Sequence, residues 1–318
     1  MRRVLGVLVT AVAAMTLAGV ASAAQLVDRD ATGVQISVNA KGEALLTYRK
    51  GSALKHVLVW GAINALPPAP GAQQVKFHLD YAGGWGKYRT LYWQHFANVC
   101  RAYDGPALPN LVAACKAPDG SYWAAQEWPQ PLPDLGFTPW LPTQNQQWLE
   151  VSHWSGPVAQ LETGMHWVYD GRFQSLFGRY TYGGQPVYGF GTTRVGAPTD
   201  GFGRLIYLDT FDSVYGAGWR RENSFVAHNP SGVFCYGFYP FDPTKGGYHY
   251  PPGQTAKRGP GVGSQYRLLA EGPGVTPNVA ATVEGLHPFD RSNQADVEQE
   301  AAAASQIAAW GDKSCRTS

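Results

Sequence analysis

The chain has 318 residues, with 25 Lys and Arg against 23 Asp and Glu, so its formal net charge is +2 at pH 7. A balance this close to neutrality gives no electrostatic reason to expect nucleic acid or an anionic membrane as partner. Charged residues make up 15% of the chain, whereas it holds 11 Trp, 17 Tyr, 38 Gly and 23 Pro. This composition is typical of short β-strands joined by tight turns, and the length suffices for one large β domain or two smaller ones.

Residues 1–23 have the pattern of a secretory signal peptide. Two arginines at 2–3 precede the apolar run 4–20, and the small residues 21–23 fit a cleavage site. We expect cleavage before Ala24 and a secreted product without membrane insertion. A retained anchor is the alternative, which we disfavour because the run has about 17 residues, the lower end of the spanning range. Cleavage removes two of the 25 basic residues and no acid, which leaves 23 of each sign.

The N-terminal part of the mature chain, 24–82, is expected to form an antiparallel meander, and whether it is a small separate domain stays open. A Pro-rich stretch at 67–71 is either a long loop within it or a boundary. The rest of the chain, 83–318, is expected to form the main β domain. The expected strands of the meander are 34–38, 44–48, 57–60 and 75–79.

The region 148–190 predicts a second meander of four strands. Turn signals at 155–157, 170–171 and 183–184 separate the strands, and alternation assigns their two faces. The expected core face holds Leu149, Val151, Leu161, Met165, Trp167 and Leu176. The expected outer face holds Trp148, Glu150, Trp154, Gln160, Glu162, His166, Phe177, Arg179 and Tyr188.

The C-terminal third predicts further strands and one helix. A hairpin is expected at 224–238, followed by strands near 266–270 and 279–284. A helix over 293–310 would be capped by Ser292 or Asn293 and stopped by Gly311. Its expected inner face carries Val297, Ala301, Ala304 and Ile307.

The four cysteines are expected to form two disulfides in an exported protein. We pair Cys100 with Cys115, which share a short looped segment, and Cys235 with Cys315, which would tie the tail to a core strand. The alternative is a nucleophilic thiol at Cys235. We disfavour it because that cysteine lies in an apolar strand with no neighbouring cation to lower its pKa.

Strand counting in 148–190 places Glu150 opposite Glu162, Glu162 opposite Arg179, and Arg179 opposite Tyr188. Two adjacent carboxylates are what a retaining glycosidase requires, so Glu150 and Glu162 are candidate catalytic residues. An arginine between glutamates is also a common structural ion pair on a sheet face, and we favour that interpretation.

The same face predicts a ligand-binding surface, because Tyr and Trp offer flat apolar rings that suit sugars and protein interfaces. Its candidate residues are Trp148, Trp154, His166, Arg179 and Tyr188. A second group of acids and bases, between Asp200 and Glu222, is expected to form ion pairs in a surface loop. No metal-ligand spacing, phosphate loop or serine nucleophile motif occurs, so we expect no cofactor and no metal.

The sequence therefore predicts a secreted, mainly β protein: antiparallel meanders form a sandwich or barrel-like domain with a C-terminal helix and two disulfides. The leading hypothesis for function is a non-enzymatic binding or envelope-associated protein that meets a neutral glycan through exposed aromatics. The alternative is a secreted glycan hydrolase that uses Glu150 and Glu162. A protein partner stays open as a third possibility.

Overall fold

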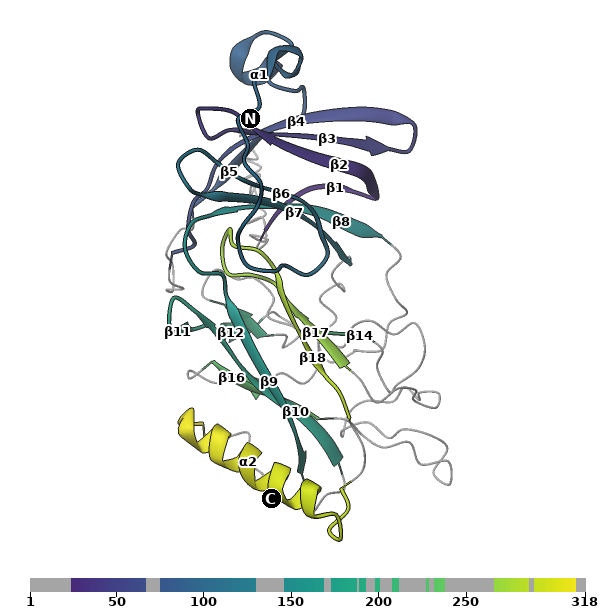
Figure 1. Cartoon of the computed structure of the whole chain (residues 1–318), viewed down its shortest axis with the longest axis vertical. Helices are drawn as coiled ribbons and strands as arrows, with labels where there is room; N and C mark the ends of the chain where they lie inside the picture. The colour runs from purple at the N-terminus through teal and green to yellow at the C-terminus, as the bar shows by residue number, and fades with distance from the viewer. Residues whose placement is uncertain are drawn as a thin grey trace, which may run out of the picture.

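The computed structural model describes residues 24–66, 75–129, 146–168, 173–187, 189–192, 198–200, 208–211, 227–228, 232–237, 266–285 and 289–312. The expected signal segment, 1–23, and the expected ion-pair loop lie wholly or largely outside these residues. The fold is mainly β, its described strand pairs are antiparallel, and a long helix stands near the C-terminus (Figure 1). The fold class is thus confirmed at that level. No helix of the described residues is long and apolar enough to cross a membrane.

The first sheet is the expected N-terminal meander. Each strand hydrogen-bonds to the next along the chain, and Gly42 and Gly51 adopt positive φ values of 75° and 57° at the two tight turns. The strands are β2 (Ala31–Val38), β3 (Ala44–Lys50), β4 (Ala53–Gly61) and β5 (Phe77–Asp80).

The second sheet packs against the first, and one apolar core lies between them. Its strand order is β1-β8-β7-β6, so its first strand comes from the N-terminus and the rest from the middle of the chain (Figure 1). Asp30, with φ of 53°, turns the chain from β1 into β2. The strands are β1 (Gln25–Arg29), β6 (Leu111–Lys116), β7 (Tyr122–Pro129) and β8 (Gln147–Trp154).

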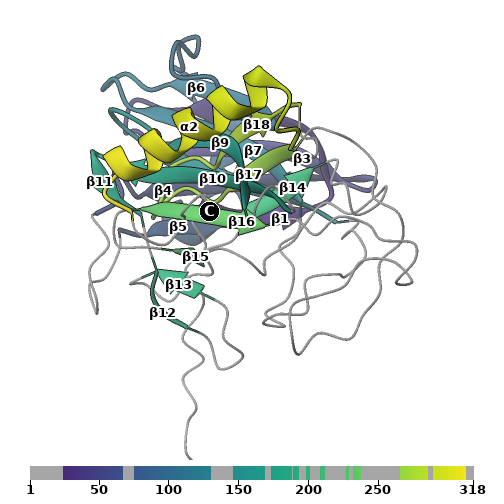
Figure 2. The same ribbon diagram turned by 90° about the horizontal axis from the view of Figure 1, so that it is seen from below.

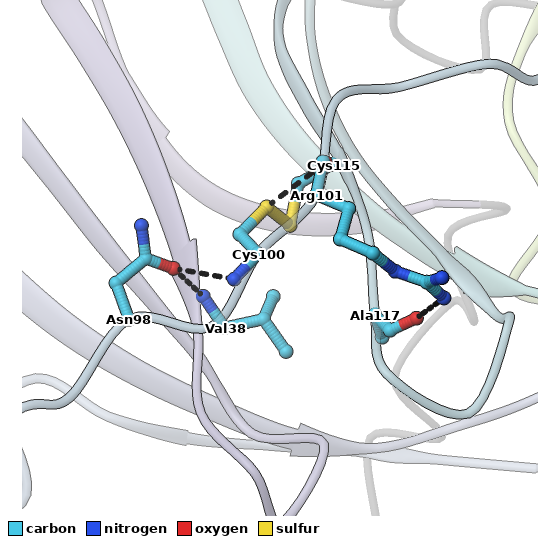
Figure 3. Close-up of a disulfide and its surroundings, with 6 residues drawn as sticks. All are labelled: Val38, Asn98, Cys100, Arg101, Cys115 and Ala117. Carbon is cyan, nitrogen blue, oxygen red and sulfur yellow. Dashed lines mark hydrogen bonds between the residues drawn. A yellow bond between two sulfur atoms is a disulfide. The ribbon is translucent and has the colours of Figure 1, made fainter.

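A disulfide joins Cys100 to Cys115 beside this core, as expected (Figure 3). Asn98 holds the neighbouring segment, because its side-chain oxygen accepts hydrogen bonds from the backbone N–H groups of Val38 and Cys100, at 3.0 Å each. The other expected bridge lies outside the described residues, since Cys315 and the side chain of Cys235 are not described.

The predicted meander over 148–190 is wrong in its first strand. β8 pairs with β1 and β7, and not with β9 (Gln160–Val168). The segment taken for its hairpin turn instead carries the chain to another sheet, and Ser155 is anchored there by the side chain of Asn64, with an N···Oδ1 distance of 2.7 Å. The later strand pairs are as predicted, because β9 pairs with β10 (Phe173–Tyr182) and β10 with β11 (Gln185–Pro186).

In the third sheet, β10 pairs with β9, β11 and β16, and β16 pairs in turn with β15. Its β15 (Ala227–His228) and β16 (Val233–Gly237) form the expected hairpin. The fourth sheet consists of β14 (Leu208–Phe211), β17 (Tyr266–Ala270) and β18 (Val279–Val283), and shares a core with β9 and β10. A small pair is formed by β12 (Gly189–Thr192) and β13 (Pro198–Asp200).

Helix α2 (Gln294–Ala309) lies against β9 and β10, on the face away from the fourth sheet (Figures 1 and 2). Asn293 is its N-cap, as expected, and accepts a hydrogen bond from Ala295 N. Of the expected inner face, Ile307 is buried and Ala304 half-buried, whereas Val297 is 40% exposed and Ala301 is exposed, and Asp296 and Ala303 are buried instead. The apolar stripe is too weak to reveal which side docks.

The loop 271–278 joins β17 to β18 of the fourth sheet and packs against the second sheet. Residues 272–278 are all buried, which is unusual for a connection between strands. Some of their polar groups bond to the second sheet: the backbone of Asn278 exchanges hydrogen bonds with the side chain of Gln126, at 3.0 Å in each direction, and Val275 O accepts from His153 N. Others bond within the loop, where Gly272 N donates to Asn278 Oδ1 and Thr276 Oγ1 to Pro273 O. We call this segment the bridging loop.

Candidate functional site

The structure separates the two candidate carboxylates. Glu150 lies on β8 opposite Gln126 of β7, whereas Glu162 lies on β9 in the third sheet. The expectation that the two glutamates face each other is therefore wrong. Alternation along β8 was read correctly, but the face of Glu150 meets the bridging loop rather than a neighbouring hairpin strand.

Glu150 has the surroundings of a structural carboxylate. It is 1% exposed, and Asn278 Nδ2 donates a 2.7 Å hydrogen bond to its Oε2. A buried carboxylate is costly unless it is hydrogen-bonded, and the amide supplies part of that compensation. Glu150 therefore links β8 of the second sheet to the bridging loop.

The pairing of Glu162 with Arg179 is confirmed by the register of β9 and β10. Arg179 also stands opposite Val233 of β16, so it lies within the sheet rather than at its edge. Glu162 is exposed. The expected next member of the row, Tyr188, lies outside the described residues.

Two of the predicted ligand-binding side chains are not on the surface. Trp154 is 0% exposed and packs edge-on against Tyr103, and His166 is 0% exposed and stacks on Phe177. The expectation that they are accessible is wrong, because neighbouring rings cover both side chains: Tyr103 and Tyr122 pack on Trp154, and Phe177 packs on His166. Trp148 is half-buried, with the guanidinium of Arg29 5.3 Å from its ring centre.

The most exposed large aromatic side chains of the described part lie elsewhere. Tyr81 is 60% exposed and Trp85 is 49% exposed, and both belong to residues 81–96, which we call the aromatic lobe. The lobe contains the short helix α1 (Trp85–Tyr88) and the 3-10 helix η1 (Tyr92–His95), at the top of Figure 1. Sequence analysis did not predict α1, because a helix of four residues produces no hydrophobic periodicity.

Glycines allow the lobe to fold tightly. Gly83 and Gly84 have φ values of 62° and 102°, and a Cβ atom on either would lie 2.6 Å from Trp93 or Tyr92. Only glycine combines this backbone conformation with so close a contact. The pair of glycines among aromatics, at 81–88, was the available sequence signal.

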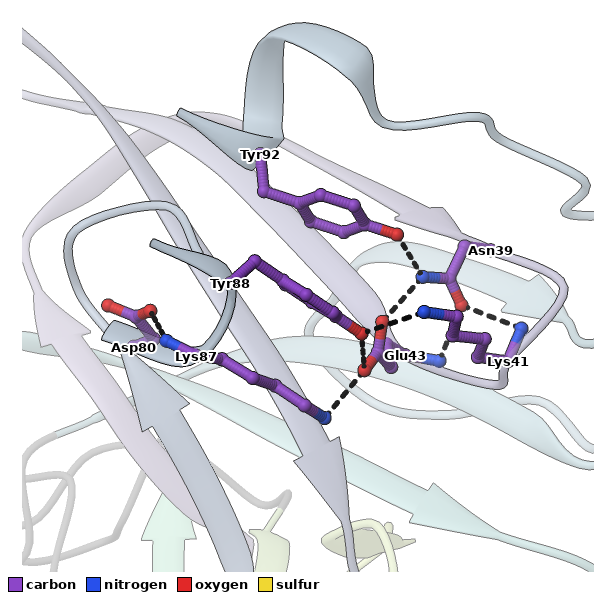
Figure 4. A network of polar contacts seen from close by, with 7 residues as sticks. All are labelled: Asn39, Lys41, Glu43, Asp80, Lys87, Tyr88 and Tyr92. Carbon is purple, nitrogen blue, oxygen red and sulfur yellow. Dashed lines mark hydrogen bonds and ion pairs between the residues drawn. The ribbon is translucent and has the colours of Figure 1, made fainter. Parts of the chain in front are cut away.

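A polar network anchors the lobe to the turn between β2 and β3 (Figure 4). The carboxylate of Glu43 is 4% exposed and accepts hydrogen bonds from Lys87 Nζ, Tyr88 Oη and Asn39 Nδ2, each at 2.6 Å. Burial alone would raise the pKa of Glu43, but the donors from Lys87, Tyr88 and Asn39 hold it below its usual value. Burial of the Tyr88 hydroxyl and its hydrogen bond to Glu43 raise the pKa of Tyr88.

Stacked rings continue this anchor across the outer face of the first sheet. His56 lies flat on Trp93, with ring centres 4.1 Å apart, and Trp60 stacks on His78 at 5.3 Å. Lys87 Nζ stands 4.1 Å from the ring centre of Trp60, a cation–π distance. The lobe is thus a rigidly held support from which Trp85 projects.

The arrangement presents exposed aromatic rings on an anchored segment. In the described part of the chain, no three His, Cys, Asp or Glu side chains gather in a way that could hold a metal ion. Comparison with protein-family models, with curated proteins and with solved structures finds no match.

Proposed function

We propose that the mature protein is secreted and binds a neutral glycan, without enzymatic activity, through exposed aromatics of the aromatic lobe. The observation that supports this most is the exposure of Trp85 and Tyr81, four residues apart on a firmly held segment. Large exposed rings on a rigid support cost little entropy when they meet a flat partner, and sugar rings present such apolar faces.

Charge supports a neutral ligand. The cation nearest the lobe's anchor, Lys87, is committed to Glu43 and to the ring of Trp60. The mature chain would have 23 basic and 23 acidic residues, after the loss of two arginines from 25. The mature chain as a whole therefore offers no excess of charge to an ionic ligand.

The hydrolase alternative receives less support. Its two carboxylates belong to different sheets, and Glu150 is buried and bonded to Asn278. A retaining enzyme needs its two carboxyl groups about 5 Å apart across the scissile bond. The binding function therefore accounts better for the described residues.

Export is part of the proposal and includes a second disulfide. A secreted protein of this composition would complete its covalent framework by joining Cys235 to Cys315. Peptide mapping of non-reduced protein, collected after export, tests this pairing. Detection of either cysteine as a free thiol would remove that bridge from the proposal.

The binding function is tested with neutral polysaccharides. Purified mature protein is run in affinity gels with soluble β-glucan, xylan and amylose and is sedimented with cellulose and chitin. Trp85→Ala and Tyr81→Ala are each expected to weaken binding by roughly 5- to 30-fold, which corresponds to about 1–2 kcal/mol for one stacked ring. Leu54→Ala, at a residue that is 53% exposed on β4, is the matched control and should bind normally.

The same incubations test the alternative. Unchanged binding by both aromatic variants would contradict a role for the lobe. Release of soluble sugar by the wild type, lost in Glu162→Gln, would instead indicate the hydrolase. Binding without release would support the proposed function.

A further inference from the structure

One buried histidine, His166, lies on β9. His166 is 0% exposed, and neither of its ring nitrogens has a hydrogen-bond partner among the described residues. The ring stacks on Phe177, with centres 5.1 Å apart. A neutral imidazole already leaves one donor and one acceptor unsatisfied there, and protonation would add a charge with two unsatisfied donors.

Helix α2 is the element that closes this site. Glu300 Oε2 accepts a 2.9 Å hydrogen bond from Trp167 N, and Gln299 Nε2 donates to Met165 O at 3.5 Å, so the helix holds the backbone on both sides of His166. Ala303 and Ile307 form a small apolar core with Phe177 and Val233, and Trp310 packs beside it. Helix α2 thus covers the side of β9 and β10 on which His166 and Phe177 lie.

The charged residues on the elements around His166 have hydrogen-bond or cross-strand partners other than its ring. By register, Glu162 and Arg179 share the face of His166 and stand opposite each other. On α2, Asp296 accepts from Asp290 N and Asn293 Nδ2, and Glu300 is bonded to Trp167 N. β16 presents Cys235 to this face by register, and its side chain lies outside the described residues.

We propose that acidification releases α2 from the third sheet through protonation of His166, and thereby uncovers the edge of β9 that the helix covers. A charged imidazole is far more stable in water than beneath an apolar helix, so the proton and the docked helix exclude each other. The uncovered edge would present Trp167 N–H and Met165 C=O to solvent, as a strand edge available for pairing.

The pH range follows from linkage. Burial lowers the pKa of His166 from 6.5 to about 4 in the docked state, so the released state takes up a proton first as the pH falls below 6.5. The docked helix is thus destabilised between about pH 6.5 and pH 4. Burial raises the pKa of Glu300, despite the bond from Trp167, and its protonation favours docking, so Glu300 opposes the effect below its folded pKa.

Hydrogen exchange read by mass spectrometry tests the release on the mature protein. After correction for intrinsic rates, amides of α2 are expected to lose protection by up to roughly 70-fold between pH 7.5 and pH 4.5, the value that the two pKa values give. His166→Leu should abolish this loss, whereas the control His95→Leu, on the exposed end of η1, should retain it. Strands of the first sheet should keep their protection in all three proteins.

Three results would overturn the proposal: equal loss in His166→Leu, no loss in the wild type, or simultaneous loss in the first sheet, which would indicate global unfolding. Should the leucine variant fail to fold, the ring of His166 in the wild type is followed by NMR through the same pH range. Protonation of the ring together with loss of α2 signals supports the release, and protonation while α2 remains docked contradicts it.

Discussion

Replacement of Glu43 with alanine should loosen the aromatic lobe more than any other single polar change in the first sheet. The carboxylate accepts three hydrogen bonds of 2.6 Å, from Lys87, Tyr88 and Asn39. Lys87, whose side chain is 29% exposed, recovers water when the carboxylate is lost, and Asn39 keeps a 3.2 Å contact with Tyr92. Because only part of the loss is recovered, we expect destabilisation by about 2–4 kcal/mol.

Urea denaturation and hydrogen exchange measure this effect at two levels. The midpoint of unfolding should fall, and the amides of residues 85–96 should lose protection first, since the lobe loses its anchor. Glu43→Gln keeps the size of the side chain and one acceptor, so its effect should be smaller. Asp104→Ala removes a carboxylate that is 60% exposed and paired with Lys116, and it should change stability much less.

The pH dependence gives a second check on the same residue. The pKa of Glu43 is lower in the folded state than its ordinary value of 4.5, so its contribution is complete above that value and is lost as the pH falls through the folded pKa. The gap in stability between the wild type and Glu43→Ala should therefore narrow from pH 6 to pH 3. A loss below about 0.5 kcal/mol at pH 7, or a gap independent of pH, would refute the account of the network.

Three further predictions concern the covalent frame, the lobe's glycines and export. Removing the Cys100–Cys115 bridge by a double change to serine should cost about 3 kcal/mol in urea denaturation, the chain-entropy value for a separation of 15 residues, and equal midpoints with and without the bridge would contradict this. Gly84→Ala should cost about 2–3 kcal/mol, because its Cβ would meet Tyr92 at 2.6 Å, against about 1 kcal/mol for Gly42→Ala, which has open space, and similar thermal midpoints would argue against the close contact. N-terminal sequencing of the exported protein should begin at Ala24, and an uncleaved N-terminus would contradict the signal peptide.

Local patterns predicted the elements whose causes are local. The first sheet follows from alternating apolar residues between glycine turns, and α2 follows from the cap at Asn293. The turn signal at 170–171 and the alternation in 160–182 predicted the register that sets Glu162 opposite Arg179. In each case the deciding interactions lie within a few residues of one another.

The candidate site failed where distant segments decide. Alternation along β8 has the same appearance whether its second face meets water or a covering loop, and residues 272–278, over a hundred positions away, cover it. Burial of Glu150 and Trp154 therefore could not be predicted from their own neighbourhood. Long-range pairing of β1 with β8 removed the expected hairpin for the same reason.

The bridging loop also determines the order in which parts of the protein can fold during synthesis. Asn278 closes contacts with Gln126 and Glu150, which precede it by 152 and 128 residues. When the chain is synthesised from its N-terminus, all strands of the first and second sheets are complete before the bridging loop, which covers one face of the second sheet, has been made. Until then, the side chains of Gln126 and Glu150 lack the partners that Asn278 supplies. The first two sheets thus reach their final state only when nearly the whole chain has been synthesised. Residues from the last quarter of the sequence complete the structure of the first half.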